Sequence, residues 1–119
     1  MAYHSFEELD IWKRGCRLAV ELCQELSEWQ NYSFRDQMQR AAISIPSNIA
    51  EGAERDSSAD FAKFLRYSKG SAAELRTQVY IAMKLNLLDR AKGEIFVQEL
   101  RELGAMIQSL IFAITKSEN

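Results

Sequence analysis

Residues that favour turns are scarce in this sequence. Only 5 glycines and 1 proline occur in 119 residues, so long stretches run without a turn former. An all-β fold needs such residues at the end of every short strand. The scarcity therefore excludes an all-β fold and favours helices.

Histidine and cysteine are also scarce, which excludes most catalytic and metal sites. The single histidine, His4, precedes the first expected helix, which excludes a di-iron Glu-x-x-His site and disfavours a Ser-His-Asp triad. Cys16 and Cys23 lie two helical turns apart, about 10 Å along an axis, which is too far for a disulfide and suits buried apolar positions. No glycine-rich phosphate-binding motif occurs. We expect no catalytic residue, no cofactor and no metal, and we do not expect an enzyme.

Long apolar runs are absent as well. Residues 1–14 contain charged side chains and no apolar run of signal-peptide length, and no segment approaches the roughly 20 apolar residues of a membrane span. The formal net charge of −2 gives no general attraction to nucleic acid or to an anionic membrane. We expect a cytoplasmic protein with no membrane partner, and no small-molecule substrate is indicated.

Apolar residues recur at spacings of three and four in four segments, the pattern of amphipathic helices. In the first segment they are Leu9, Trp12, Cys16, Ala19, Cys23 and Leu26. The stripes of the other three segments are, in order, Phe34, Met38, Ala41, Ile45 and Ile49; Phe61, Leu65, Ser68, Ala72, Leu75, Val79 and Ala82; and Phe96, Leu100, Leu103, Ile107, Leu110 and Ile114. Ser5, Ser33, Ser57 and Asp89 are suitable N-caps, Gly52 is a suitable C-terminal stop, and Asn86 tolerates a left-handed conformation. The pattern predicts helices over about residues 6–28, 34–52, 58–86 and 90–116. Short connections favour antiparallel neighbours, hence one all-α domain over 1–119, an up-down-up-down four-helix bundle.

A second set of apolar residues lies outside these stripes. Its members are Ile11, Leu18, Leu22, Phe64, Tyr67, Tyr80, Ile81, Met83, Ile95, Val97, Met106, Ile111 and Phe112. A wide core stripe can absorb about half of them. The remainder would form exposed apolar patches, which usually mark protein contacts. We therefore expect self-association rather than a monomer.

The stretch from Arg40 to Gly52 places a proline inside a helical pattern. Pro46 removes the hydrogen bond to the Ala42 carbonyl and is expected to kink or break the second helix. We expect this turn to pack on the small residues Gly70 and Ser71 of the third helix, with Asn48 contacting Glu74 or Ser71. The residues of this motif are Arg40, Ser44, Pro46, Asn48, Glu51, Gly52, Gly70, Ser71 and Glu74. A structural role is favoured over a binding site.

Basic residues gather on one side of the third segment. Arg66, Lys69 and Arg76 fall within about 80° on a helical projection, with Lys63 beside them and Tyr67 and Tyr80 nearby. Basic and aromatic side chains in alternation can hold a single-stranded nucleic acid. The alternative is an ordinary solvated helix face, which the acidic balance of the whole chain favours.

Two long motifs carry a resemblance to a known family. The run from Arg40 to Gly52 and the run Gly70-Ser-Ala-Ala-Glu-Leu75, with Phe6, Leu9 and Trp12 and with Phe61 to Leu65, resemble the bacterial four-helix bundle proteins encoded by intervening sequences within 23S rRNA genes. That family is similar to the accessory variability protein of diversity-generating retroelements, a basic homopentameric barrel considered to hold RNA and a reverse transcriptase. The resemblance implies a bundle, a pentameric ring and a connection with RNA. It supplies no catalytic residue.

These observations lead to two functional hypotheses. The first is a non-enzymatic homo-oligomer, a pentamer, acting as a scaffold or interaction protein linked to RNA or the ribosome. The alternative is an RNA-binding module that uses Lys63, Arg66, Lys69 and Arg76. With 15 basic and 17 acidic residues, the chain lacks the strongly positive surface of the retroelement relatives.

Overall fold

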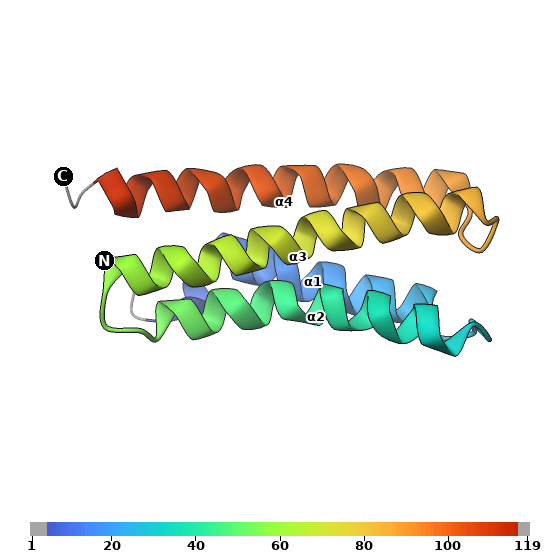
Figure 1. The fold of residues 1–119 in the computed structure, drawn as a ribbon, viewed down its shortest axis with the longest axis horizontal. Helices are drawn as coiled ribbons and strands as arrows, with labels where there is room; N and C mark the ends of the chain where they lie inside the picture. The colour runs from blue at the N-terminus through green and yellow to red at the C-terminus, as the bar shows by residue number, and fades with distance from the viewer. Residues whose placement is uncertain (1–4, 117–119) are drawn as a thin grey trace.

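The computed structural model describes residues 5–116, which form four long α-helices. A short 3-10 helix, η1 (Phe6–Glu8), precedes α1 (Asp10–Glu25), α2 (Tyr32–Ala53), α3 (Ser58–Lys84) and α4 (Arg90–Lys116). Each α-helix runs opposite to the one before it (Figure 1). The predicted all-α four-helix bundle is confirmed.

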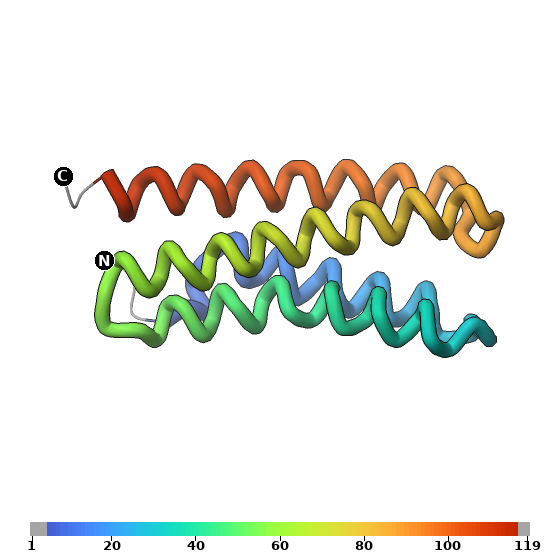
Figure 2. Tube along the Cα trace, in the orientation of Figure 1, coloured from blue at the N-terminus to red at the C-terminus, as the bar shows by residue number. Residues whose placement is uncertain are grey.

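The bundle is a rod of 47 × 20 × 19 Å in which α3 packs against both α2 and α4. The backbone trace shows α4 along one edge and α1 and α2 together along the other (Figure 2). The α3–α4 surface is therefore on the side of the rod opposite the α1–α2 pair.

Within residues 5–116, none of the helices combines the length and the apolar character that a membrane span requires.

Several helix ends follow the predicted capping chemistry. The Ser57 hydroxyl accepts a hydrogen bond from the Asp60 N–H at 3.1 Å. At the start of α4, the Asp89 carboxylate accepts one from the Lys92 N–H at 3.3 Å. Asn86 adopts a left-handed φ of 60° just after α3. Ser57, Asp89 and Asn86 were thus correctly identified from their chemistry alone.

Other predicted ends were wrong. The first helix begins at Asp10 rather than Phe6, because Leu9 has an extended backbone (ψ 127°) and separates it from η1. The N-cap of α2 is Asn31, whose side chain accepts from the Phe34 N–H, and not Ser33. Gly52 does not end α2, which continues to Ala53.

The buried core confirms the predicted stripes of α2, α3 and α4 almost completely. Of those stripes, only Phe34 and Leu110 are partly rather than fully buried. The stripe of α1 was confirmed at Ala19 and Leu26, which are buried, and wrong at Cys16 and Cys23, which are only half-buried. Ile11, Leu18 and Leu22 complete the buried side of this helix. The core side of α1 is therefore rotated away from the predicted one.

The surplus apolar residues divide into three groups, of which the smallest, Phe64, Met83 and Met106, is half-buried. Ile11, Leu18, Leu22, Val97 and Ile111 are buried and belong to the core. Tyr67, Tyr80, Ile81, Ile95 and Phe112 remain exposed, with exposed fractions between 41% and 65%. The core thus absorbs part of the set, and an exposed apolar remainder exists on α3 and α4.

Candidate functional site

Pro46 lies inside an unbroken helix. The α-helical conformation of α2 continues past Pro46 to Ala53, so the predicted break does not occur. Pro46 is buried against α1, where a Cβ added to Gly15 would lie 3.4 Å from the Pro46 Cβ. The glycine of α1, rather than a residue of α3, accommodates the proline ring.

The predicted packing of this turn on Gly70 is therefore wrong. Gly70 is exposed, and a Cβ added there would meet no atom within 4 Å. Ser71 does reach α2, but its partner is Ser44, the two hydroxyl oxygens lying 2.6 Å apart. Asn48 contacts neither Glu74 nor Ser71, and its amide instead donates to the Ser44 carbonyl at 2.8 Å.

Serine hydroxyl groups fix the proline turn to α3. The fully buried Ser68 hydroxyl donates to the Ile45 carbonyl at 2.8 Å, and the Ser44 hydroxyl, which also donates to the Ala41 carbonyl within α2, lies against Ser71. Because these hydroxyl groups have partners across the two helices, they strengthen the α2–α3 contact. The structural interpretation of the motif agrees with these contacts.

The remaining motif residues have separate positions. Arg40 and Glu74 line one shallow depression beside Ser44. The Glu51 carboxylate forms an i, i+4 ion pair with Arg55 at 3.2 Å. Gly52 is buried, and a Cβ there would lie 2.7 Å from the Phe64 Cβ. Gly52 is therefore needed for the close approach of α2 and α3.

Two of the predicted basic residues meet in a groove between α3 and α4, which we call the α3–α4 groove. Its volume is about 320 Å³, and its charged or amide-bearing walls are Lys69, Arg76, Arg101 and Gln108. Small residues lie between these walls, namely Ala72, Ala73, Gly104 and Ala105. Arg101 and Gln108 of α4 were missed by the sequence analysis, because only the packing of α3 on α4 brings them to this surface.

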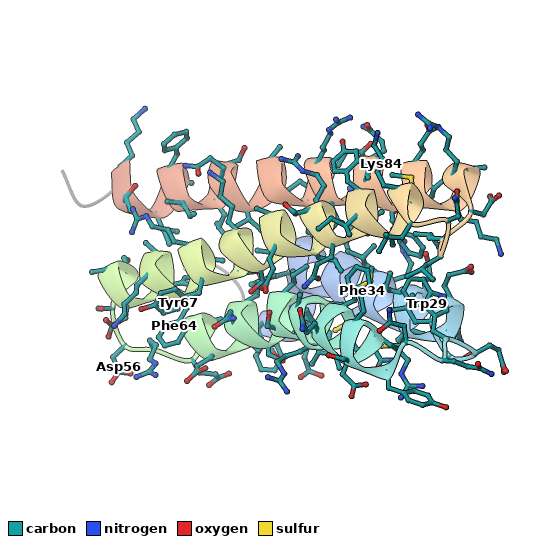
Figure 3. All side chains as sticks on the ribbon, turned by 45° about the vertical axis from the view of Figure 1, so that its right-hand side comes forward. Trp29, Phe34, Asp56, Phe64, Tyr67 and Lys84 are labelled. Atoms are coloured by element: carbon teal, nitrogen blue, oxygen red, sulfur yellow. The ribbon has the colours of Figure 1, made fainter. Side chains whose placement is uncertain are left out.

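A second, larger hollow of about 630 Å³ adjoins the α3–α4 groove through Arg101. Its lining includes Tyr80, Lys84 and the paired Arg90 and Glu94. The Arg101 guanidinium donates to the Tyr80 hydroxyl at 2.9 Å, which connects the two hollows. Lys84 projects from the far end of α3 (Figure 3).

The cations of α3 are unusual in their lack of carboxylate partners. Its five cations are Lys63, Arg66, Lys69, Arg76 and Lys84, against two carboxylates, Asp60 and Glu74. Among the residues described, none of these five cations forms an ion pair, whereas the cations of α1, α2 and α4 include several that do. The face of α3 is therefore locally positive on a chain whose net charge is −2.

The other predicted basic residues lie outside the groove lining. The Lys63 ammonium is 6.0 Å from the centre of the Phe64 ring, whose other neighbours are the Arg55 guanidinium at 4.6 Å and the Tyr67 ring. This cluster lies at the start of α3, at the end of the bundle away from Trp29 and Phe34 (Figure 3). Arg66 is exposed on α3. The four predicted residues thus form a groove pair and two outlying cations.

The joint between α1 and α4 is made by ion pairs. Arg14 of α1 binds both Glu99 and Glu102 of α4, the latter at 3.0 Å, and Arg17 binds Glu99 at 3.3 Å. The hydrogen bonds that Arg14 donates to Glu102 and then to Glu99 raise the pKa of Arg14. Those from Gln98 and then Arg14 lower the pKa of Glu102. These charges are satisfied within the chain and are not free to hold a ligand.

Two of the groups considered for redox or metal chemistry, the Cys16 and Cys23 thiols, lie within the described residues and are half-buried. Burial raises the pKa of the Cys16 and Cys23 thiols, so both are protonated at neutral pH. Within residues 5–116, no three or more His, Cys, Asp or Glu side chains are grouped so as to hold a metal ion. His4 lies outside the described residues.

Comparisons with known proteins identify the fold and the family of the chain. A comparison with curated proteins found no match. A solved structure of a protein of unknown function from the S23 ribosomal protein family of Bacteroides thetaiotaomicron VPI-5482 superimposes with a TM-score of 0.80, covering 85% of this chain and 97% of that chain at 22% identity. That likeness confirms the fold. The model of the 23S rRNA-intervening sequence protein family matches residues 7–109, and the chain therefore belongs to this family.

Proposed function

We propose that this protein is a non-enzymatic homo-oligomer, a pentamer, that acts as a scaffold or interaction protein linked to 23S rRNA or the ribosome. The outward face of α4 carries the proposal. The stretch from Leu103 to Thr115 contains no charged residue, and Phe112 within it keeps 65% of its surface exposed. An exposed, uncharged helix face on a bundle that already has a core favours a protein contact.

A closed ring needs two different surfaces on each subunit. A heterologous contact joins one patch of a subunit to another patch of its neighbour, and it closes if the rotation permits. The uncharged face of α4 is the first surface, formed by residues that share one side of the helix, Ser109, Phe112 and Ala113. The second is the opposite edge of the rod, where Val20 of α1 and Ile43 of α2 are 55% and 52% exposed.

The test is the mass in solution. Light scattering on the purified chain at micromolar concentration should give about five times the 13.7 kDa chain mass. A monomer would remove the proposal, and a dimer or tetramer would remove the ring. The link to rRNA is tested separately, by isolating the protein from its own cells and identifying the bound RNA and proteins.

RNA binding by α3 is the second candidate function, and the unpaired cations of α3 favour it. Around a ring of five subunits, Arg66, Lys69 and Arg76 would supply about fifteen charges, so weak phosphate contacts would add through multivalency. Anisotropy titrations with 23S rRNA fragments at low and physiological salt test this. The double variant Arg66→Glu with Arg76→Glu should abolish binding, and binding that survives it would place the RNA on another face.

A further inference from the structure

The α3–α4 groove has a regular construction. Lys69 and Arg76 are seven residues apart on α3, and Arg101 and Gln108 are seven apart on α4, so each pair lies on one side of its helix about 10 Å apart. The helices are antiparallel, so Lys69 lies opposite Gln108 and Arg76 opposite Arg101. The Lys69 ammonium donates to the Gln108 amide oxygen at 2.5 Å. The groove thus has a pair of facing polar side chains at each end, with small residues between the two pairs.

Helix packing does not require the small residues between the two polar pairs. A glycine inside a helix costs about 1 kcal/mol relative to alanine. Gly104 lies in the middle of α4, yet a Cβ added there would meet no atom within 4 Å. Neighbouring Ala73 and Ala105 are exposed. Core packing therefore does not explain why this part of the surface is so small, whereas a ligand seated against it would.

The charge of the groove indicates an anion. Its lining contains three cations and no carboxylate. Arg76 has no ion-pair partner among the described residues, and the recorded partners of Lys69 and Arg101 are the neutral groups of Gln108 and Tyr80. Two guanidinium groups from facing helices line the groove without a carboxylate beside them, and guanidinium is the group that binds phosphate through paired N–H donors.

We infer that the α3–α4 groove is a phosphate-binding site for the backbone of single-stranded RNA, an inference that rests on the RNA-binding candidate above. Arg76 and Arg101 hold one phosphate from opposite sides, and Lys69 neutralises a neighbouring one. Gln108 orients the Lys69 ammonium. Tyr80, which is 41% exposed and whose hydroxyl is fixed by Arg101, offers its ring to an adjoining base.

Two double variants that lose the same number of positive charges test the position of the site. Arg76→Gln with Arg101→Gln removes two cations from the groove. Lys13→Gln with Arg40→Gln removes two exposed cations from α1 and α2 that form no ion pair within residues 5–116. Binding of a fluorescent oligouridylate to the full chain is followed by anisotropy between about 50 and 200 mM salt. The groove variant should lose about tenfold in affinity per arginine. The slope of log K against log salt should fall by about 1.4, at about 0.7 per lost contact. The control variant should change little.

A second probe separates the site from the RNA function. Inorganic phosphate is titrated against 15N-labelled protein, with sodium chloride at equal ionic strength as the reference, and the amide shifts of Ala73 and Gly104 are followed. We expect saturable shifts with phosphate that are absent in the groove variant. Gly104→Leu, which fills the groove without a change of charge, should weaken both phosphate and RNA binding while the melting temperature does not fall.

The outcomes are distinguishable. Equal RNA affinity in the groove and control variants would overturn the site and leave RNA binding on another face. Phosphate shifts without RNA binding by the parent chain would support the phosphate site but overturn its assignment to RNA. Loss of RNA binding in the control variant alone would overturn the site. If the parent chain shows neither phosphate-dependent shifts nor RNA binding, both the site and the RNA candidate are overturned. If the groove is instead covered by a second copy, the groove variant changes the mass in light scattering and not the phosphate shifts.

Discussion

At the scale of single residues, the glycines of this protein divide by what surrounds them. Gly15, Gly52 and Gly93 face neighbouring helices, where a side chain would meet Pro46, Phe64 or Met83. Gly70 and Gly104 face open space. The same residue type therefore serves close helix packing in the first group, whereas in the second it costs helix stability without a packing gain.

Gly52→Ala and Gly104→Ala should change stability in opposite directions. A Cβ at Gly52 would lie 2.7 Å from the Phe64 Cβ and 3.2 Å from the Phe61 carbonyl oxygen, so overpacking should cost about 1–3 kcal/mol. A Cβ at Gly104 meets nothing, so the better helix propensity should add about 0.5–1 kcal/mol. Urea denaturation at one fixed protein concentration measures both. Destabilisation by Gly104→Ala would show that α4 is covered by something in solution.

Ser68 provides a second test at this scale. Its hydroxyl is fully buried and bonds the Ile45 carbonyl, next to the proline. Ser68→Ala should therefore lower the free energy of unfolding by about 1 kcal/mol. Ser71→Ala is the matched control, because Ser71 is only half-buried and the Ser44 hydroxyl keeps its bond to Ala41. Equal costs in circular-dichroism melts would contradict a special role for Ser68.

At the scale of helices, local chemistry predicted some ends and missed others. Ser57 and Asp89 bond the backbone three residues ahead, a signal contained within a few positions. Gly52 also matches a local signal, that of a helix stop, but the close approach of Phe64 decides its role. Sequence reasoning failed where a distant contact competes with local preference.

The rotation of α1 has the same cause. Two apolar stripes run along this helix, one through Trp12, Cys16 and Cys23 and the other through Ile11, Leu18 and Leu22. Nothing local distinguishes them. Gly15 is buried on the same side of α1 as the second stripe, where it leaves room for Pro46 of α2, and no pattern within α1 could reveal a partner on α2.

The ion pairs between α1 and α4 should make stability depend on pH. Glu102 has a lowered pKa in the folded chain, through its hydrogen bonds with Gln98 and Arg14. Its contribution is therefore complete above its unfolded pKa of about 4.3 and is lost as the pH falls through the lower folded value. Glu102→Gln should be less stable than the parent near neutral pH, and the difference should shrink below about pH 4.3. A difference that stays constant on acidification would contradict the linkage.

At the scale of the whole molecule, only half of the proposed phosphate site was visible in the sequence. Lys69 and Arg76 share a stripe of one helix, so the helical period brings them together. Arg101 and Gln108 lie on α4, and their place beside that stripe depends on the register of two antiparallel helices. Periodicity predicts which side of a helix a residue occupies and does not predict which residue lies across a groove.

Assembly and RNA binding should be coupled in this protein. Phe112 is 65% exposed in the centre of the uncharged face of α4, so Phe112→Glu would place a charge in the proposed contact between subunits. We expect this variant to scatter light as a monomer, and Phe112→Leu, the control, to retain the parent mass. RNA affinity should fall with the loss of the ring, by a factor of about 100 or more, because single grooves lose multivalency. The phosphate-dependent shift of Gly104 should persist in the monomer, since all groove residues come from one chain. A monomer that binds RNA as tightly as the parent would show that the ring does not contribute to RNA binding.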